Sequence, residues 1–279
     1  MDDSSVGGHP IFKRWTGQSV PWGPEGRYEM SFGGDVLKSL TDGLDQFLES
    51  GARWSRRRMP GVLGCTPWLT DAEIVDRLVH FSECCVVINK PESLPGRLRL
   101  VDDQITQLHE AGHGLRLEVL RGLEEMAPKV DGKPLLVGPY DTLEWPTFWS
   151  VRVAGVRKTS RRSIPLVHAK LLVGGFVHWS DEHPSGYTEE WWSFEPRRLW
   201  FGSANFTNNA RRSLEFGSWV DDVDLLGQAT AFLTDLLTYS EQWGSTSIEP
   251  DPELASYDYD EEAMWEAWRE QRYGEPDGE

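Results

Sequence analysis

Five polar side chains between residues 168 and 215 lie in or beside apolar runs and together could transfer a phosphoryl group. His168 and Lys170 stand two residues apart in one run, Ser203 and Asn205 follow a second, and Glu215 lies in a third. A neutral imidazole can attack phosphorus to form a phospho-histidine, which water then hydrolyses. The carboxylate could fix the tautomer of the imidazole, while the ammonium, hydroxyl and amide groups stabilise charge on the phosphoryl oxygens. The set predicts phosphodiester hydrolysis without a metal ion or a cofactor.

Only the combination of these residues is informative. His-x-Lys alone is a weak signal, because a chain with seven histidines contains it by chance in roughly one case in three or four. The apolar neighbours of His168 and Lys170 predict a strand, whose period of two places both side chains on one face. Burial of both groups would be costly without a function. Taken singly, Asn205 could merely cap a turn, and Glu215 could pair with a nearby arginine such as Arg211.

The same residues resemble the signature of the phospholipase D superfamily, which is His-x-Lys-(x)4-Asp followed by Gly-Ser-x-Asn and a glutamate. The matching residues here are His168, Lys170, Gly202, Ser203, Asn205 and Glu215. Residues 64–74 also resemble the family's early strand-to-helix step, so the resemblance covers about residues 55–245. The motif departs at Gly175, where the family has an aspartate that is usually supportive and is missing from some active members.

The chemistry also predicts assembly. Once phosphorylated, His168 cannot protonate the leaving oxygen, although a general acid typically contributes about 10² to 10⁴ in rate. The family solves this with a second His-x-Lys motif related by a pseudo-twofold axis. None of the four histidines in residues 1–160 is followed by lysine at the second position. We therefore expect a homodimer in which two copies share one composite site. His178 or His183 could instead act within the chain.

Nucleic acid, either DNA or RNA, is the expected substrate, because the compact single-motif form resembles the superfamily's nucleases. The candidate substrate-binding residues are Arg157, Arg161, Arg162, Trp191 and Trp192. The arginines suit a phosphate backbone, and the aromatic rings could stack on bases. The same rings could enter a lipid surface, so a phospholipase D-type lipid hydrolase is an alternative. A degenerate member, marked by Gly175, that only binds nucleic acid or a partner protein is a second alternative.

The order of expected elements predicts the α/β class, with a mixed β-sheet sandwiched between helices as in the phospholipase D-like fold and one motif per chain. Apolar spacing and turn residues predict helices over 35–48, 70–81, 101–111 and 223–239, and strands over 61–66, 84–88, 165–173, 199–202 and 214–220. We expect an irregular lead-in and first helix over 1–54, the phospholipase D-like domain over 55–248, and an acidic tail over 249–279.

Charge is distributed unevenly along the chain. The formal net charge is −17, and residues 249–279 contribute −10 of it through 12 acidic and 2 basic residues. A solvated tail is the simplest interpretation. Alternatively, the tail could shield a basic site until a ligand displaces it. The overall charge opposes a polyanionic partner unless positive charge is gathered on one surface.

His109-Glu110-Ala-Gly-His113 matches the His-Glu-x-x-His motif of zinc hydrolases. Glycines on both sides of His113 indicate a helix end, so we predict no metal site here. Three cysteines are too few for a disulfide framework, no apolar stretch reaches the length of a membrane span, and the amino terminus is acidic and polar. These features predict a cytoplasmic protein.

Overall fold

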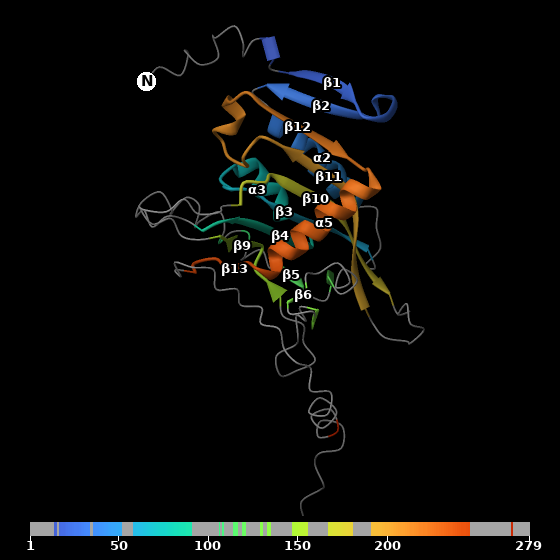
Figure 1. Cartoon of the computed structure of the whole chain (residues 1–279), viewed down its shortest axis with the longest axis vertical. Helices are drawn as coiled ribbons and strands as arrows, with labels where there is room; N and C mark the ends of the chain where they lie inside the picture. The colour runs from blue at the N-terminus through green and yellow to red at the C-terminus, as the bar shows by residue number, and fades with distance from the viewer. Residues whose placement is uncertain are drawn as a thin grey trace, which may run out of the picture.

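The computed structural model describes residues 14–15, 17–33, 36–51, 58–90, 106, 108, 114–116, 119–120, 129–130, 133–134, 147–155, 167–180, 191–245 and 269. A nine-stranded sheet lies at its centre, in the order β1-β2-β12-β11-β10-β3-β4-β9-β13 (Figure 1). Its strands are β1 Gln18–Trp22, β2 Tyr28–Gly33, β3 Arg58–Cys65, β4 Glu83–Asn89, β9 Val151–Ala154, β10 Leu171–Ser180, β11 Trp191–Gly202, β12 Glu215–Val220 and β13 Glu241–Gln242.

The helices are α2 Val36–Gly51, α3 Ala72–Leu78 and α5 Val223–Thr238, with short 3₁₀ turns η1 Pro24–Gly26 and η3 Ala210–Arg212. Two small sheets pair β5 Leu115–Arg116 with β8 Thr147–Phe148, and β6 Lys129–Val130 with β7 Lys133–Pro134. In the main sheet β4 is parallel to both β3 and β9, whereas the other pairs are antiparallel. The predicted α/β class with a mixed sheet is confirmed.

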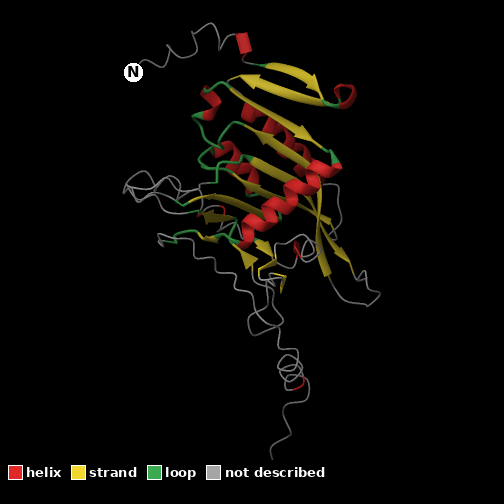
Figure 2. Cartoon of the chain, viewed as in Figure 1, coloured by secondary structure: helices red, strands yellow, loops and turns green. Residues whose placement is uncertain are grey.

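Apolar residues of the helices form two separate buried clusters with the sheet. Leu37, Leu40 and Leu44 of α2 belong to one cluster, which also contains residues of α3. Leu233 and Leu237 of α5 belong to the other. Figure 2 shows α5 lying across the sheet, where it contacts β10, β11 and β3. Apolar residues three and four apart on each helix therefore meet the sheet, as the sequence periodicity predicts.

Several predicted helices and strands are confirmed, although their first and last residues differ from the prediction. The structure has α2, β3, α3, β4, β12 and α5 where helices or strands were expected. The side chain of Asp71 accepts a hydrogen bond from Ile74 N at 3.1 Å and caps α3. Thr106 and Leu108 are helical, and the rest of the helix predicted over 101–111 lies outside the described residues. No helix among the described residues is long and apolar enough to cross a membrane.

Two predictions about the sheet are wrong. Within the supposed irregular lead-in, β1 and β2 form a hairpin whose second strand pairs with β12. The side chains of β1 are mostly exposed, whereas β2 alternates the half-buried Tyr28, Met30 and Phe32 with polar residues, a strand pattern that the sequence analysis did not use. The strand expected over 165–173 begins only at Leu171, and β10 and β11 extend well beyond their expected ends to pair along a long hairpin.

Candidate functional site

The imidazole of His168 and the ammonium of Lys170 are in contact immediately before β10. Lys170 Nζ lies 3.1 Å from His168 Nδ1, 3.3 Å from Nε2 and 2.8 Å from the His168 carbonyl oxygen. Both residues were predicted within a strand, but here they precede it. The ring of His168 is exposed, whereas Lys170 is only 7% exposed. The solvent-accessible imidazole of His168 thus contacts the buried ammonium group of Lys170.

The electrostatics of this pair are set by the buried ammonium group. Lys170 Nζ lies at nearly the same distance from both ring nitrogens of His168, so the ammonium faces the ring as a whole. Burial lowers the pKa of Lys170 from its ordinary value, while attraction to Glu215 raises it in opposition. The negative charge of Glu215 therefore helps to keep a buried ammonium beside His168.

Ser203 and Glu215 lie beside this pair on neighbouring strands. Gly202 N donates to the Lys170 carbonyl oxygen at 3.3 Å, which brings the end of β11 against the start of β10. Ser203 Oγ donates to Glu215 Oε2 at 2.5 Å and accepts from Phe216 N at 3.0 Å. We expected Glu215 to hold the ring of His168, but its carboxylate instead accepts from Ser203. The hydroxyl of Ser203 is thereby fixed in orientation.

Asn205 carries a buried polar atom that lacks a partner. Its Oδ1 makes no hydrogen bond within the part of the chain that the structure describes. A buried acceptor left unsatisfied costs about 1–3 kcal/mol. Such a group, three residues after the end of β11, is typical of a residue whose partner is a ligand or another chain. This observation distinguishes Asn205 from a residue that merely caps a turn.

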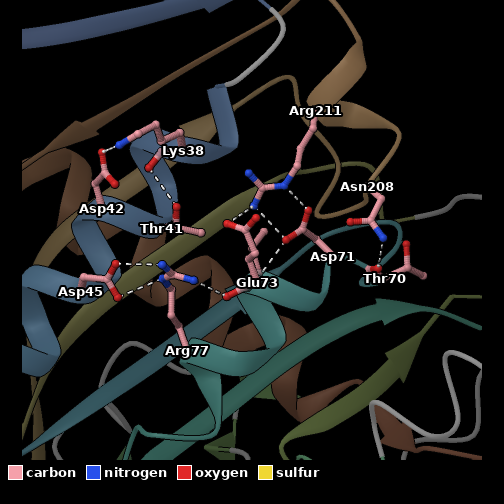
Figure 3. Close-up of polar contacts among 11 residues, drawn as sticks. Lys38, Thr41, Asp42, Asp45, Thr70, Asp71, Glu73, Arg77, Asn208 and Arg211 are labelled. Atoms are coloured by element: carbon pink, nitrogen blue, oxygen red, sulfur yellow. Dashed lines mark hydrogen bonds and ion pairs between the residues drawn. The ribbon is translucent and has the colours of Figure 1, made fainter. Parts of the chain in front are cut away.

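The loop that carries Asn205 is fastened to the loop before α3. The carbonyl oxygen of Phe206 accepts from Thr70 N at 2.8 Å and from Asp71 N at 3.0 Å. Arg211 donates to both carboxylate oxygens of Asp71, at 2.6 and 3.0 Å, and pairs with Glu73 at 3.2 Å (Figure 3). The Asp71 carboxylate is fully buried. These contacts, which sequence reasoning missed, hold the backbone on both sides of the site loop.

Two further residues support the His168 segment from β3 and β4. Asn89 Oδ1, at the end of β4, accepts from Val167 N at 2.8 Å. Cys65 Sγ, at the end of β3, lies 3.9 Å from the Ala169 carbonyl oxygen. Burial raises the pKa of the Cys65 thiol to about 12, so this sulfur is a neutral packing group rather than a nucleophile. We had interpreted Asn89 only as a strand terminator.

Gly175, at the position where the phospholipase D signature has an aspartate, lies where β10 and β11 shift register. A Cβ atom at this position would stand 2.2 Å from the Glu195 carbonyl oxygen and 2.9 Å from the Phe194 ring. The backbone of β11 thus occupies the space that an aspartate would need. The packing of this hairpin accounts for the departure from the motif.

The candidate substrate-binding residues are only partly described. Arg157, Arg161 and Arg162 lie outside the described residues, as does the side chain of Trp191. The ring of Trp192 is half-buried, and the guanidinium carbon of Arg116 lies 4.1 Å from its centroid. Trp192 is therefore already covered on one face by a protein cation.

Other histidines were considered as the general acid or as metal ligands. His178 is eight residues beyond Lys170 on β10, roughly 26 Å at 3.3 Å per residue, and its Nε2 pairs with Glu195 at 2.6 Å. His178 is thus too distant to act as the acid within this chain, and His183 lies outside the described residues. His109 and His113 also lie outside them. Among the residues that are described, no group of three or more histidine, cysteine or carboxylate side chains is arranged to hold a metal ion.

Two solved structures are similar to this chain. NucT from Helicobacter pylori is 13% identical, with 78% of this chain and 100% of that chain covered and a TM-score of 0.37. A phospholipase D family member, Nuc from Salmonella typhimurium, is 12% identical, with 72% and 91% covered and a TM-score of 0.36. No protein-family model matches the sequence, and no curated protein is similar to it. At these identities and TM-scores, a function has to be inferred from the chain's own residues.

Proposed function

We propose that this protein is a metal-independent phosphodiesterase of the phospholipase D superfamily, and specifically a nuclease. The observation that carries the proposal is the contact between the exposed ring of His168 and the buried ammonium of Lys170, beside Ser203 and Glu215. A structural role alone gives no reason to place an exposed imidazole on a buried cation. The sheet with helices on both faces and a single motif per chain would then be this family's arrangement.

The first step is attack by a neutral ring nitrogen of His168 on phosphorus. A nitrogen–phosphorus bond forms while the bond to the leaving oxygen breaks, and that oxygen takes a proton from a general acid. The ammonium of Lys170 stabilises the growing negative charge on the phosphoryl oxygens, and the amide group of Asn205 donates to them. Glu215 acts through Ser203, because its carboxylate holds that hydroxyl in place.

In the second step, water attacks the phospho-histidine and loses its proton to the same acid–base group, so that His168 is restored and a phosphate monoester is released. The second copy of the chain supplies this acid–base group through its own His168. Leu214 and Phe216, which flank Glu215, are 39% and 41% exposed, as expected of residues that a second copy would cover. The site is incomplete without that copy.

Nucleic acid suits the proposal better than lipid. Cleavage of a nucleic acid needs its phosphate backbone to be held within reach of His168, and the arginines predicted to bind it, Arg157, Arg161 and Arg162, shortly precede His168 in the sequence. A phospholipase D-type lipid hydrolase is the second candidate, favoured by the exposed rings and alkyl groups beside Glu215. A binder without turnover is the third, and the orphaned Asn205 Oδ1 would then be satisfied by a bound partner.

The test is incubation with single- and double-stranded DNA, RNA and phosphatidylcholine, all in EDTA. We expect cleavage of a nucleic acid that survives EDTA and is lost in His168→Ala. The covalent intermediate should be trapped by acid quenching as a phosphorylated protein that His168→Ala does not form. Cleavage that continues unchanged in His168→Ala, or that EDTA abolishes, would contradict the proposed chemistry. Hydrolysis of phosphatidylcholine alone would identify the lipid hydrolase.

Arg27→Gln provides a matched control for these assays. Arg27 forms an exposed ion pair with Asp221 at 2.8 Å, and neither residue belongs to the proposed site. Its removal should leave turnover unchanged. Analytical ultracentrifugation of the same samples tests the composite site. A protein that is active as a monomer at assay concentrations would contradict the shared acid–base group.

A further inference from the structure

A cavity of about 420 Å³ opens between the C-terminal part of α2 and the neighbouring strands β3, β10 and β11. Three arginines, Arg58, Arg197 and Arg198, line it together with Gln46, Phe47 and Phe176. Phe176 is six residues beyond Lys170 on β10, roughly 20 Å along the strand. The cavity is therefore distinct from the proposed active site.

The charge of this cavity is positive in a strongly acidic protein. Glu195 pairs with Arg197 at 2.5 Å and with Arg58 at 3.6 Å. The same carboxylate also pairs with His178 at 2.6 Å. Within the described residues, three guanidinium groups line the cavity and the carboxylate of Glu195 pairs with two of them, so positive charge is in excess there. The formal net charge of the whole chain is −17, so the cavity is a positively charged region of a negatively charged protein.

Packing holds two of the three guanidinium groups in place. The Arg58 guanidinium carbon lies 4.2 Å from the centroid of the Phe176 ring. Arg198 donates to Gln46 Oε1 at 2.9 Å, and its guanidinium carbon lies 5.1 Å from the centroid of the Trp219 ring. Burial lowers the pKa of both Arg58 and Arg198 from their ordinary value, although neighbouring carboxylates oppose this. A bound anion would offset the desolvation of these charges.

We propose that this arginine pocket (Arg58, Arg197 and Arg198) binds a phosphate monoester, carried by the end of a nucleic acid strand or by a free nucleotide. A monoester carries about −1.5 to −2 charges at pH 7 and a diester only one, so a cluster of guanidinium groups attracts the monoester more strongly. The planar fork of arginine suits bidentate contact with phosphate oxygens. Small-molecule sites span about 300–1,000 Å³, so the cavity can hold a nucleotide. The pocket uses no group of the proposed active site.

The test is calorimetric titration of the full chain with inorganic phosphate, AMP and adenosine, none of which contains a phosphodiester bond. We expect phosphate and AMP to bind and adenosine not to bind. Arg197→Gln, which removes an exposed cation, should weaken AMP binding about tenfold. Glu195→Gln should tighten it severalfold, because the negative charge that pairs with Arg58 and Arg197 is removed. Arg27→Gln should change nothing.

A second titration identifies the source of the monoester. A tetranucleotide with a 5′-phosphate is compared with its 5′-hydroxyl form in the His168→Ala background, so that neither is cleaved. Tighter binding of the phosphorylated tetranucleotide than of AMP indicates a strand end, and equal binding indicates a free nucleotide. Equal binding of AMP and adenosine would overturn the proposal. So would loss of AMP binding in Lys170→Ala with full retention in Arg197→Gln. Turnover is measured separately, so the proposed nuclease activity can fail without affecting this result.

Discussion

Replacing Arg211 by methionine should destabilise the protein by about 2–4 kcal/mol. Removing one member of a buried ion pair costs about 3–5 kcal/mol, because an uncompensated charge remains in the interior. The carboxylate of Asp71 is fully buried, whereas the Arg211 side chain is 19% exposed, so water recovers part of the loss. The capping bond from Ile74 N survives the change, which lowers the expected cost further.

Urea unfolding followed by circular dichroism measures this change through the midpoint and slope of the transition. Arg27→Met is the matched control, since it removes the same group from an exposed ion pair, and its cost should be much smaller than that of Arg211→Met. Arg211→Lys keeps the charge but loses the two-point contact, so its cost should lie between the two. A cost for Arg211→Met no greater than that for Arg27→Met would refute the role assigned to this pair.

The same variant should also reduce turnover more than stability alone explains. Arg211 and Asp71 lie beside the backbone hydrogen bonds that hold Phe206, and Phe206 follows Asn205 directly. A loosened loop misplaces Asn205, and a misplacement of 1 Å can cost about 10²-fold in rate. Turnover is compared under conditions where each variant remains folded. Wild-type turnover in a folded Arg211→Met protein would show that Asp71 and Arg211 serve stability only.

Three other changes test separate parts of the site. Gly175→Asp should lower the free energy of unfolding by more than about 2 kcal/mol without raising activity, because the backbone of β11 occupies the space that the new side chain needs. Urea unfolding and turnover assays measure the two effects, and a stable, more active variant would contradict this prediction. Asn205→Ala should abolish turnover yet leave stability unchanged or raise it by about 1 kcal/mol in urea, since a buried orphan is removed. Lys170→Met tests the titration of the buried ammonium group. Burial lowers the pKa of Lys170 in the folded protein, so the unfolded chain binds more protons between that pKa and 10.5. The wild type should therefore gain stability relative to the variant as pH rises through this window. A pH-independent difference would argue against a desolvated ammonium.

Apolar periodicity was sufficient to predict the buried elements. Leu37, Leu40 and Leu44 of α2 recur at helical spacing, and the continuous apolar run of β4 is typical of a strand buried on both faces. The β1–β2 hairpin was missed although Tyr28, Met30 and Phe32 of β2 alternate with polar residues, because the run is short and the neighbouring β1 is mostly exposed. Apolar patterning reports burial, so an exposed strand such as β1 leaves little trace in the sequence.

The candidate site was predicted by residue type, but its contacts were not. His168 and Lys170 stand two residues apart, so their meeting follows from local geometry. The pairing of Asp71 with Arg211 spans 140 residues, and only the fold brings them together. The contact of Glu215 with Ser203 was not predicted, because a sequence does not reveal that the end of β11 places a serine hydroxyl against this carboxylate.

The pairing of β2 with β12 has a practical consequence for truncated forms of the chain. A fragment starting at residue 55, the boundary that the sequence suggests, would lack β1 and β2 as well as α2, whose leucines belong to the core. The strand headed by Glu215 would then present a row of unpaired amide and carbonyl groups, because Gly33 and its neighbours no longer cover it. Exposed strand edges of this kind recruit other chains. Aggregation or strand exchange in such a fragment would therefore reflect a lost cover and would say nothing about natural assembly.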